Sequence, residues 1–144
     1  MPTRVLVPYD GSRLSEHALE FAAERFGEAE LTVLQVIDPM TAAYDAPLER
    51  PTPGFWDTWY EETREGAEAE LETAAAGVAA DAGDVETVVE VGKPADVILA
   101  TCEDGDYGHV VMGSHGREGL SRLFLGSVAE AVLRRAPVPV TVVR

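Results

Sequence analysis

The sequence has little cysteine, little lysine and no long hydrophobic run. Its single cysteine, Cys102, excludes an internal disulfide, a cysteine-ligated zinc site and a CxxC redox pair. No apolar stretch approaches the roughly 20 residues that a transmembrane helix needs, so no membrane association is expected. The first residues also lack the basic start and apolar stretch of a signal peptide. These absences predict a cytoplasmic protein.

Basic residues are scarce, since 26 Asp and Glu face 11 Lys and Arg and give a formal net charge of −15. Only Lys93 is a lysine. A pI near 4.4 argues against binding to nucleic acid, because a phosphate backbone would be repelled. An acidic surface suits either a basic partner or concentrated salt. Because the acids are spread from Asp10 to Glu130, we favour salt adaptation and a halophilic source.

Short apolar segments alternate with amphipathic ones along the 144 residues, which suit one domain spanning residues 1–144. Apolar strands separated by helices are typical of a parallel sheet covered by helices on both faces, which is an α/β, doubly wound fold. The predicted strands cover residues 4–8, 31–37, 85–91, 107–112 and 138–143, and the predicted helices follow Ser12, cover 55–82, start at Pro94 and cover 126–135.

Two segments between the strands stand out. Residues 38–54 contain four prolines and predict a long irregular connection. The helix predicted at 55–82 is rich in alanine and glutamate. Its expected inward-facing residues are Trp56, Trp59, Leu71 and Val78.

A glycine-rich stretch follows the fourth predicted strand. Gly113 comes directly after that strand, Gly116 follows three residues later, and Gly126 with Ser127 opens the last helix. Such glycines let the backbone approach a ligand, and a helix N-terminus favours phosphate. Residues 113–135 also carry a local charge of +2, from Arg117, Arg122, Arg134 and Arg135 against Glu118 and Glu130. The stretch predicts a site for a phosphorylated anion.

A purely structural explanation of the same residues stays open. Ser127 and Glu130 have the spacing of a capping box, which stabilises a helix start without any ligand. Arg134 and Arg135 would complement the C-terminus of that helix. Glycine-rich loops also follow strands in proteins where nothing binds.

The pattern Gly-x2-Gly-x9-Gly-Ser, together with Val-Pro-x-Asp-Gly-Ser at residues 7–12, resembles the universal stress protein family. The resemblance spans nearly the whole chain. It implies an open, Rossmann-like and flavodoxin-like parallel sheet of five strands in the order 3-2-1-4-5. In that family the glycine pattern marks the members that bind ATP, whereas other members lack it and bind no nucleotide. The resemblance therefore implies ATP, with Mg²⁺, as the ligand.

Combining the family pattern with the physics of doubly wound sheets gives candidate roles. The first and fourth strands would be neighbours, and ligands bind at the carboxyl ends of strands at such a point. Asp10 would accept hydrogen bonds from the ribose or hold a metal ion bound to the phosphates, unless it only forms a turn with Gly11. The remaining candidates are Pro8 and Tyr9 beside adenine, Val36 and Ile37 as backbone partners of the base or as core residues, Met112 and Gly113 beside the ribose, and His115, Gly116, Arg117, Gly126, Ser127 and Val128 around the phosphates.

No catalytic set is present in the sequence. It contains neither the GxxxxGK[ST] loop nor the GxSxG elbow. His17 is expected at the surface or partly buried, His109 as a satisfied core residue, and Cys102 as a small buried hydrophobe. Three scattered histidines make no metal site. Any ATP hydrolysis should be slow, so a nucleotide sensor is favoured over an enzyme.

The last predicted strand, 138–143, is apolar and lies at a sheet edge in the implied order. The resemblance implies a homodimer formed through this strand. The competing hypothesis is an interaction or chaperone-like module that uses the same fold without nucleotide and docks partners on the acidic helix that follows Trp56. A nucleotide hydrolase or AMP-forming enzyme is the least supported alternative.

Overall fold

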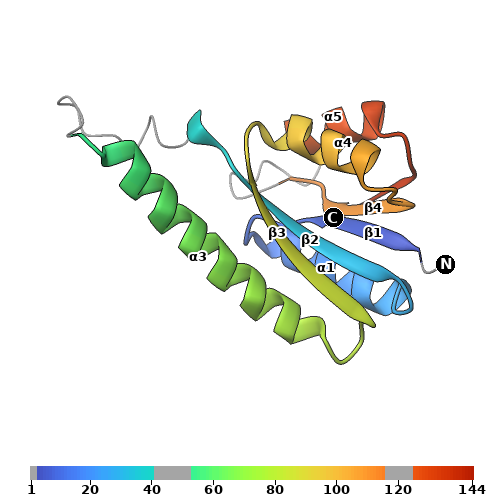
Figure 1. Cartoon of the computed structure of the whole chain (residues 1–144). Helices are drawn as coiled ribbons and strands as arrows, with labels where there is room; N and C mark the ends of the chain where they lie inside the picture. The colour runs from blue at the N-terminus through green and yellow to red at the C-terminus, as the bar shows by residue number, and fades with distance from the viewer. Residues whose placement is uncertain (1–2, 41–52, 116–124) are drawn as a thin grey trace.

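Five parallel strands form the centre of the protein in a computed structural model, which describes residues 3–40, 53–115 and 125–144. Their order is β3-β2-β1-β4-β5, so the predicted order is confirmed (Figure 1). All four neighbouring pairs are parallel. The strands are β1 (Arg4–Pro8), β2 (Glu30–Ile37), β3 (Asp84–Val91), β4 (His109–Gly113) and β5 (Val140–Val143).

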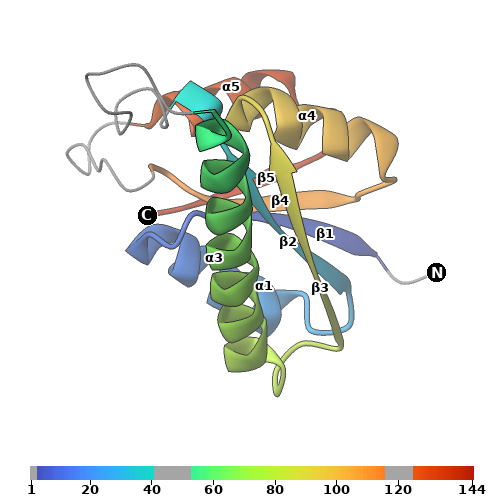
Figure 2. The ribbon, with the colours of Figure 1, turned by 60° about the vertical axis from the view of Figure 1, so that its left-hand side comes forward.

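Helices cover both faces of the sheet, as predicted. Helices α1 (Arg13–Arg25) and α3 (Phe55–Val78) pack on one face, and α4 (Pro94–Asp104) and α5 (Ser127–Arg135) pack on the other (Figure 2). None of the helices in the described parts of the chain is long and apolar enough to cross a membrane.

The alternation of side chains along β1 builds both halves of the core. Val5 and Val7 are fully buried against α1 and α3, whereas Leu6 is fully buried in the cluster that contains α4 and α5 residues. A fully buried aliphatic side chain contributes about 1.5–3 kcal/mol of hydrophobic free energy. The uninterrupted apolar run of β1 is thereby explained, because this central strand is covered on both sides.

Some boundaries differ from the prediction. Helix α3 ends at Val78 rather than residue 82, and β4 begins at His109 rather than residue 107. Tyr107 lies before β4 and is buried. Its ring lies 4.4 Å from the Arg4 guanidinium, which also donates a hydrogen bond of 3.1 Å to the Tyr107 hydroxyl. Strand β5 begins at Val140 instead of residue 138.

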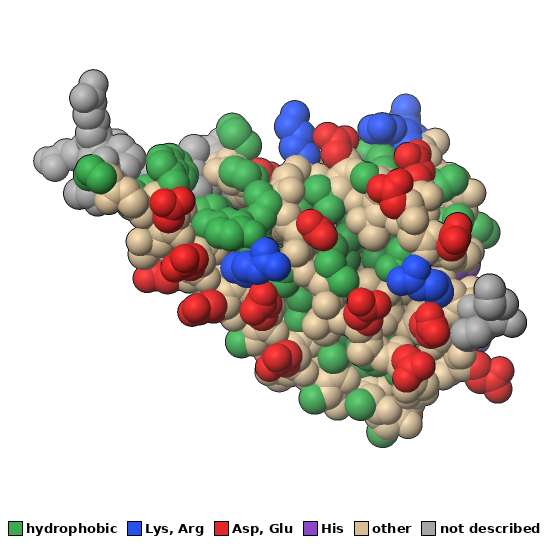
Figure 3. Space-filling model, viewed as in Figure 1, with side chains coloured by type: hydrophobic (Ala, Val, Ile, Leu, Met, Phe, Trp, Pro, Cys, Tyr) green, Lys and Arg blue, Asp and Glu red, His purple; other side chains and the backbone are tan. Residues whose placement is uncertain are grey.

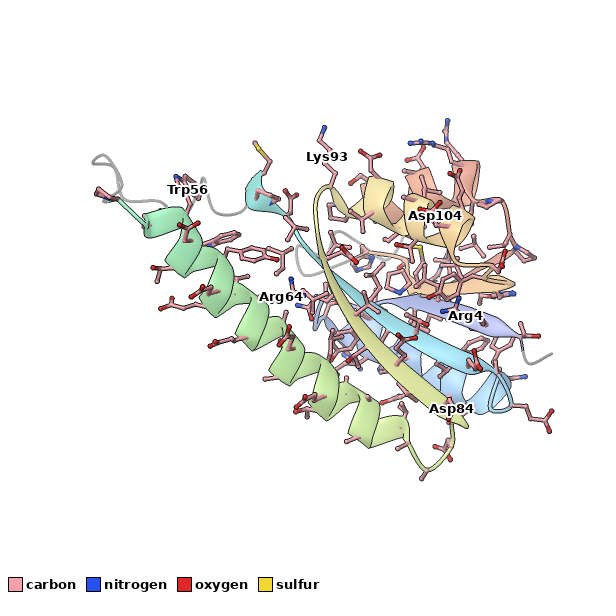
Figure 4. All side chains as sticks on the ribbon, in the orientation of Figure 1. Arg4, Trp56, Arg64, Asp84, Lys93 and Asp104 are labelled. Carbon is pink, nitrogen blue, oxygen red and sulfur yellow. The ribbon has the colours of Figure 1, made fainter. Side chains whose placement is uncertain are left out.

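The prediction that Trp56 points inward is wrong. Its side chain is 50% exposed, whereas Trp59 packs partly against the core and Leu71 is fully buried. Trp56 stands in the first turn of α3, at the end that extends away from the sheet (Figure 4). Helical spacing alone assigned Trp56 to the same face as Trp59, but the sheet does not reach that end of the helix.

Cys102, His17 and His109 lie on three different elements, α4, α1 and β4. Cys102 is buried on α4, as expected, and burial raises the pKa of its thiol to about 11. His17 is partly buried. His109 is also only partly buried, so its expected core position is wrong, although it is satisfied: its Nε2 lies 2.7 Å from the Thr141 hydroxyl. Burial lowers the pKa of His109.

Candidate functional site

A pocket of about 510 Å³ lies at the carboxyl ends of β1, β2 and β4. Strand β1 pairs with β2 on one side and with β4 on the other, so the winding of the chain reverses here. Doubly wound sheets bind ligands at this switch point. The pocket is lined by Pro8, Tyr9, Asp10, Ser12, Ser15, Leu34, Val36, Asp38, Pro94, Ile98, Met112, Gly113, His115, Gly126, Ser127, Val128 and Ala129.

The turn after β1 forms one polar wall. The Asp10 carboxylate accepts a hydrogen bond from the Ser12 amide at 2.9 Å, so the turn named as the alternative to a binding role is present. Gly11 has a φ of 81°, a left-handed conformation that favours glycine. Ser12 caps α1, since its hydroxyl accepts a hydrogen bond from the Ser15 amide at 3.2 Å. The turn therefore fixes the Asp10 carboxylate at the pocket.

Helix α5 presents its N-terminus to the pocket. Gly126 is the N-cap residue, makes no side-chain cap, and is followed by three pocket-lining residues at the start of the helix. The capping-box prediction is wrong: Ser127 is the first helical residue, and the Glu130 carboxylate instead pairs with Arg134 at 2.8 Å. The first amides of an α-helix have no acceptor within the helix, and they form the positive end of its dipole. This wall of the pocket suits an anion.

The two ends of the loop between β4 and α5 are held together. The Gly126 amide donates a hydrogen bond of 2.7 Å to the Ser114 carbonyl, and the Ser114 hydroxyl lies 3.1 Å from His115 Nδ1. A Cβ on Gly126 would meet the Cα and Cβ of His115 at 3.1 Å, which is tighter than ordinary contact. The candidates Gly116 and Arg117 lie outside the described residues.

The pocket also has an apolar wall. It combines Leu34 and Val36 from β2, Pro94 and Ile98 from α4, and Met112 from β4. These residues belong to the face of the sheet that α4 and α5 cover and to α4 itself. This wall suits a flat apolar group.

Ile37, predicted as a backbone partner of the base or as a core residue, is a core residue and does not line the pocket. Its side chain is buried in the core on the opposite face, because neighbouring strand residues point to opposite sides. Its carbonyl accepts a hydrogen bond of 3.0 Å from the Gly92 amide. Val36, by contrast, lines the pocket.

The prediction that Arg134 and Arg135 contribute to a positive patch at the site is wrong. Both stand in the last turn of α5, at the end opposite the pocket, where Arg134 pairs with Glu130 and Arg135 lies 3.7 Å from an Asp96 carboxylate oxygen. The other two arginines of that patch, Arg117 and Arg122, lie outside the described residues. Within the described part of the pocket, the positive potential comes from the α5 N-terminus.

Several pocket residues were missed. Asp38 follows β2 as Asp10 follows β1, so the rule that selected Asp10 could have found it. Leu34 could have been found from the alternation that places it on the same face as Val36. The remaining missed residues, Ser12, Ser15, Pro94, Ile98 and Ala129, depend on how the helices pack on the sheet, which no local pattern gives.

Replacing Gly113 with alanine is expected to destabilise the protein by about 1–3 kcal/mol. A Cβ at this position would meet the Leu14 Cβ at 2.9 Å and its carbonyl carbon at 3.1 Å, so the start of α1 would have to move. Urea unfolding measures the effect. Gly66→Ala is the matched control, because Gly66 lies within α3 with open space around it and alanine there should add about 0.5–1 kcal/mol. Equal stability of the wild type and Gly113→Ala would contradict the close packing of β4 on α1.

A doubly wound α/β sheet with a pocket at its switch point and a helix N-terminus in the pocket wall defines a Rossmann-like fold. The model of the universal stress protein family matches residues 1–144, and the chain belongs to this family.

Individual relatives agree with this assignment. A putative universal stress protein of Staphylococcus saprophyticus is 34% identical over 151 residues, which cover 97% of this chain and 82% of the relative. The structure of the hypothetical protein MJ0577 matches with a TM-score of 0.83 and 28% identity, over 99% of this chain and 96% of that one. A universal stress protein solved in complex with cAMP matches with a TM-score of 0.69 and 25% identity, over 99% and 97% of the two chains.

Proposed function

We propose that the protein binds an adenine nucleotide, ATP in its working state, in the pocket at the switch point and acts as a nucleotide-dependent regulator of a stress response. The observation that carries the proposal is the union of an apolar wall with the N-terminus of α5 in one pocket of about 510 Å³. A nucleotide base packs against an apolar wall, and a phosphate chain binds at a helix N-terminus. The relative solved with cAMP supports the class of ligand, and the glycine pattern of residues 113–127 supports ATP.

In this proposal each wall of the pocket contacts a different part of the nucleotide. Adenine would lie against Leu34, Val36 and Ile98, while the phosphates would approach the first amides of α5 around Ser127. The predicted contacts of Pro8, Tyr9, Met112 and the other lining candidates remain part of this proposal, as do those of Gly116 and Arg117.

Asp10 fits a magnesium ion only together with the nucleotide. The described residues contain no group of three His, Cys, Asp or Glu side chains that could hold a metal ion. One carboxylate combined with phosphate oxygens is, however, a usual environment for Mg²⁺. Asp10 would therefore hold either the metal ion or the ribose hydroxyls, from a position already fixed by the Ser12 amide.

We favour binding over catalysis. In the described part of the pocket the ionisable side chains are Tyr9, Asp10, Asp38 and His115. Two carboxylates next to a phosphate chain supply no obvious stabilisation of a leaving group, so hydrolysis should be slow at most. A nucleotide that binds reversibly without being hydrolysed can report its own concentration through the fraction of protein that it occupies.

Calorimetric titration with ATP, AMP, cAMP and adenosine, with and without Mg²⁺, tests the proposal. One molecule per chain is expected, and ATP should bind more tightly than adenosine because only ATP reaches the α5 N-terminus. Equal affinity for adenosine and ATP would contradict the role of α5. No binding of any of them would favour the interaction module that uses the same fold without nucleotide.

We also propose a homodimer formed through β5. This strand is at one edge of the sheet, and its four residues are apolar or neutral and only partly buried. Two such edges can pair across a twofold axis without bringing like charges together.

Val140→Lys is expected to convert the dimer into a monomer on sizing chromatography, because it places a charge in the paired edge. Val91→Lys is the matched control: Val91 is 39% exposed on β3, the opposite edge, so the dimer should persist. Thermal melting checks that both variants are folded. A dimeric, folded Val140→Lys protein would exclude this interface.

The acidic surface supports a cytoplasm rich in salt. Helix α3 alone carries seven acidic residues and a single arginine. Figure 3 shows acidic side chains along this helix and over the neighbouring surface. Arginine in place of lysine fits the same proposal, which makes the protein a salt-adapted, cytoplasmic member of its family.

A further inference from the structure

Strand β3 forms the outer edge of the sheet, opposite β5. In the described part of the chain its one strand neighbour is β2, so its outer side has no strand partner. It spans eight residues, five of them exposed. Figures 1 and 2 both show β3 at the rim of the sheet with α3 beside it. A strand edge of this length is a template for pairing with another extended chain.

A hollow of about 350 Å³ runs beside this edge. Its walls are Arg64, Glu68 and Glu72 of α3 and residues 87–90 of β3. Figure 4 shows Arg64 pointing from α3 toward the sheet. Helix α3 therefore packs on one face of β3 but leaves a trough along the strand. An added chain would have space for its side chains there.

The charges along this edge decide which chain would fit. Asp84, Glu86 and Glu90 lie on the face of β3 opposite α3, since side chains alternate along a strand and Val85 and Val89 pack in the core cluster of α3. On the α3 face, Glu68 and Glu72 border the trough. One of the carboxylates of β3, that of Glu86, lies 4.0 Å from the Arg4 guanidinium. Arg64 lines the trough as well, but its guanidinium is held by the Glu68 carboxylate at 3.0 Å. The edge as a whole is strongly negative.

A second copy of the chain does not fit this edge. Pairing β3 with another β3 would place carboxylates opposite carboxylates, which is destabilising across a strand pair. The β5 edge, by contrast, has no ionisable side chain between Val140 and Val143. The two edges thus suit different partners.

We propose that the outer edge of β3 binds an extended, basic segment of a partner protein by strand addition. Main-chain hydrogen bonds to β3 would provide much of the affinity, and alternating basic side chains would meet Asp84, Glu86 and Glu90. The recognised pattern is therefore a basic residue at every second position. This site is separate from the nucleotide pocket and does not depend on nucleotide binding.

Titration with synthetic peptides tests the proposal on the full chain, in the lowest KCl concentration that keeps it folded. The probe is a peptide as long as β3 in which lysine and valine alternate. A peptide of equal charge with proline in place of valine removes backbone donors, and a glutamate–valine peptide reverses the charge. Binding of the first peptide alone is expected. Equal binding of the proline peptide, or no binding of the lysine–valine peptide, would overturn strand addition.

Variants and NMR locate the binding. Asp84→Asn/Glu90→Gln should weaken the lysine–valine peptide about tenfold, because it removes two of the three carboxylates that the basic side chains would meet. The matched control Glu20→Gln/Glu24→Gln removes two exposed charges from α1 and should change the affinity less than about twofold. Amide shifts should concentrate in Asp84–Val91. Equal effects of the two double variants, or shifts spread over the acidic surface without a maximum in β3, would overturn the proposal.

Discussion

Ser127→Glu is expected to weaken ATP binding about 100-fold, or about 2.7 kcal/mol, while the protein stays folded. Ser127 is exposed at the first position of α5 and lines the pocket, so a glutamate fits without repacking. It would place a carboxylate where the phosphates approach. An acidic residue in the first turn stabilises a helix, so the melting temperature should not fall.

Thr58→Glu is the matched control for this variant. Thr58 is exposed near the start of α3, away from the pocket, so the substitution adds the same charge to the first part of another helix. Calorimetry should find its ATP affinity unchanged. If Ser127→Glu binds ATP as tightly as the wild type, the phosphates do not lie at the α5 N-terminus.

Raising KCl from dilute buffer to molar concentration is expected to raise the melting temperature by about 10 °C or more. The net charge of −15 opposes the compact state, and salt screens this repulsion. Helix α3 shows the effect locally: Glu61 and Glu65 are four residues apart, as are Glu68 and Glu72, and such like-charged pairs destabilise a helix. Differential scanning calorimetry across the salt series measures the change.

Glu61→Gln/Glu65→Gln shows whether screening is the cause. The double variant should melt above the wild type in dilute buffer, and the difference should shrink as KCl rises. A melting temperature that stays flat across the salt series would contradict salt adaptation. It would favour the other explanation of the acidic surface, a basic partner.

The sheet could be predicted from the sequence because its central strands are apolar on both faces. The residues of β1 illustrate this, since Val5, Leu6 and Val7 are all fully buried. The place of the pocket followed from the strand order, which the family resemblance supplied. Trp56 shows the limit of periodicity: it stands where α3 extends past the sheet, so its ring lies 5.2 Å from that of Phe55 and 6.5 Å from that of Trp59 and remains half exposed.

The candidate site could be predicted in part. Local patterns located the polar wall, because Asp10 ends a strand and Ser127 begins a helix. They did not locate Pro94 and Ile98, which reach the pocket through the packing of α4 on the sheet. For Ile37 the sequence left a contact with the base and a core position open, because that choice depends on which face of β2 the side chain is on, and the structure places it in the core.

The glycine motif has two roles that sequence alone does not separate. Gly113 is required where Leu14 approaches β4, and Gly126 where the loop closes on His115. Both glycines would be retained for packing even in a protein with an empty pocket. Replacing Gly113 therefore tests the fold, whereas replacing Ser127 tests the ligand.

The identity of any nucleotide that copurifies with the protein tests the central claim most directly. The protein would be purified in high KCl, denatured, and the released nucleotide identified and quantified by mass spectrometry. The pocket at the switch point predicts an adenine nucleotide, mostly ATP, close to one per chain, and its loss from Ser127→Glu. A wild-type protein that releases no nucleotide and fails to bind added ATP with Mg²⁺ would contradict the proposed function.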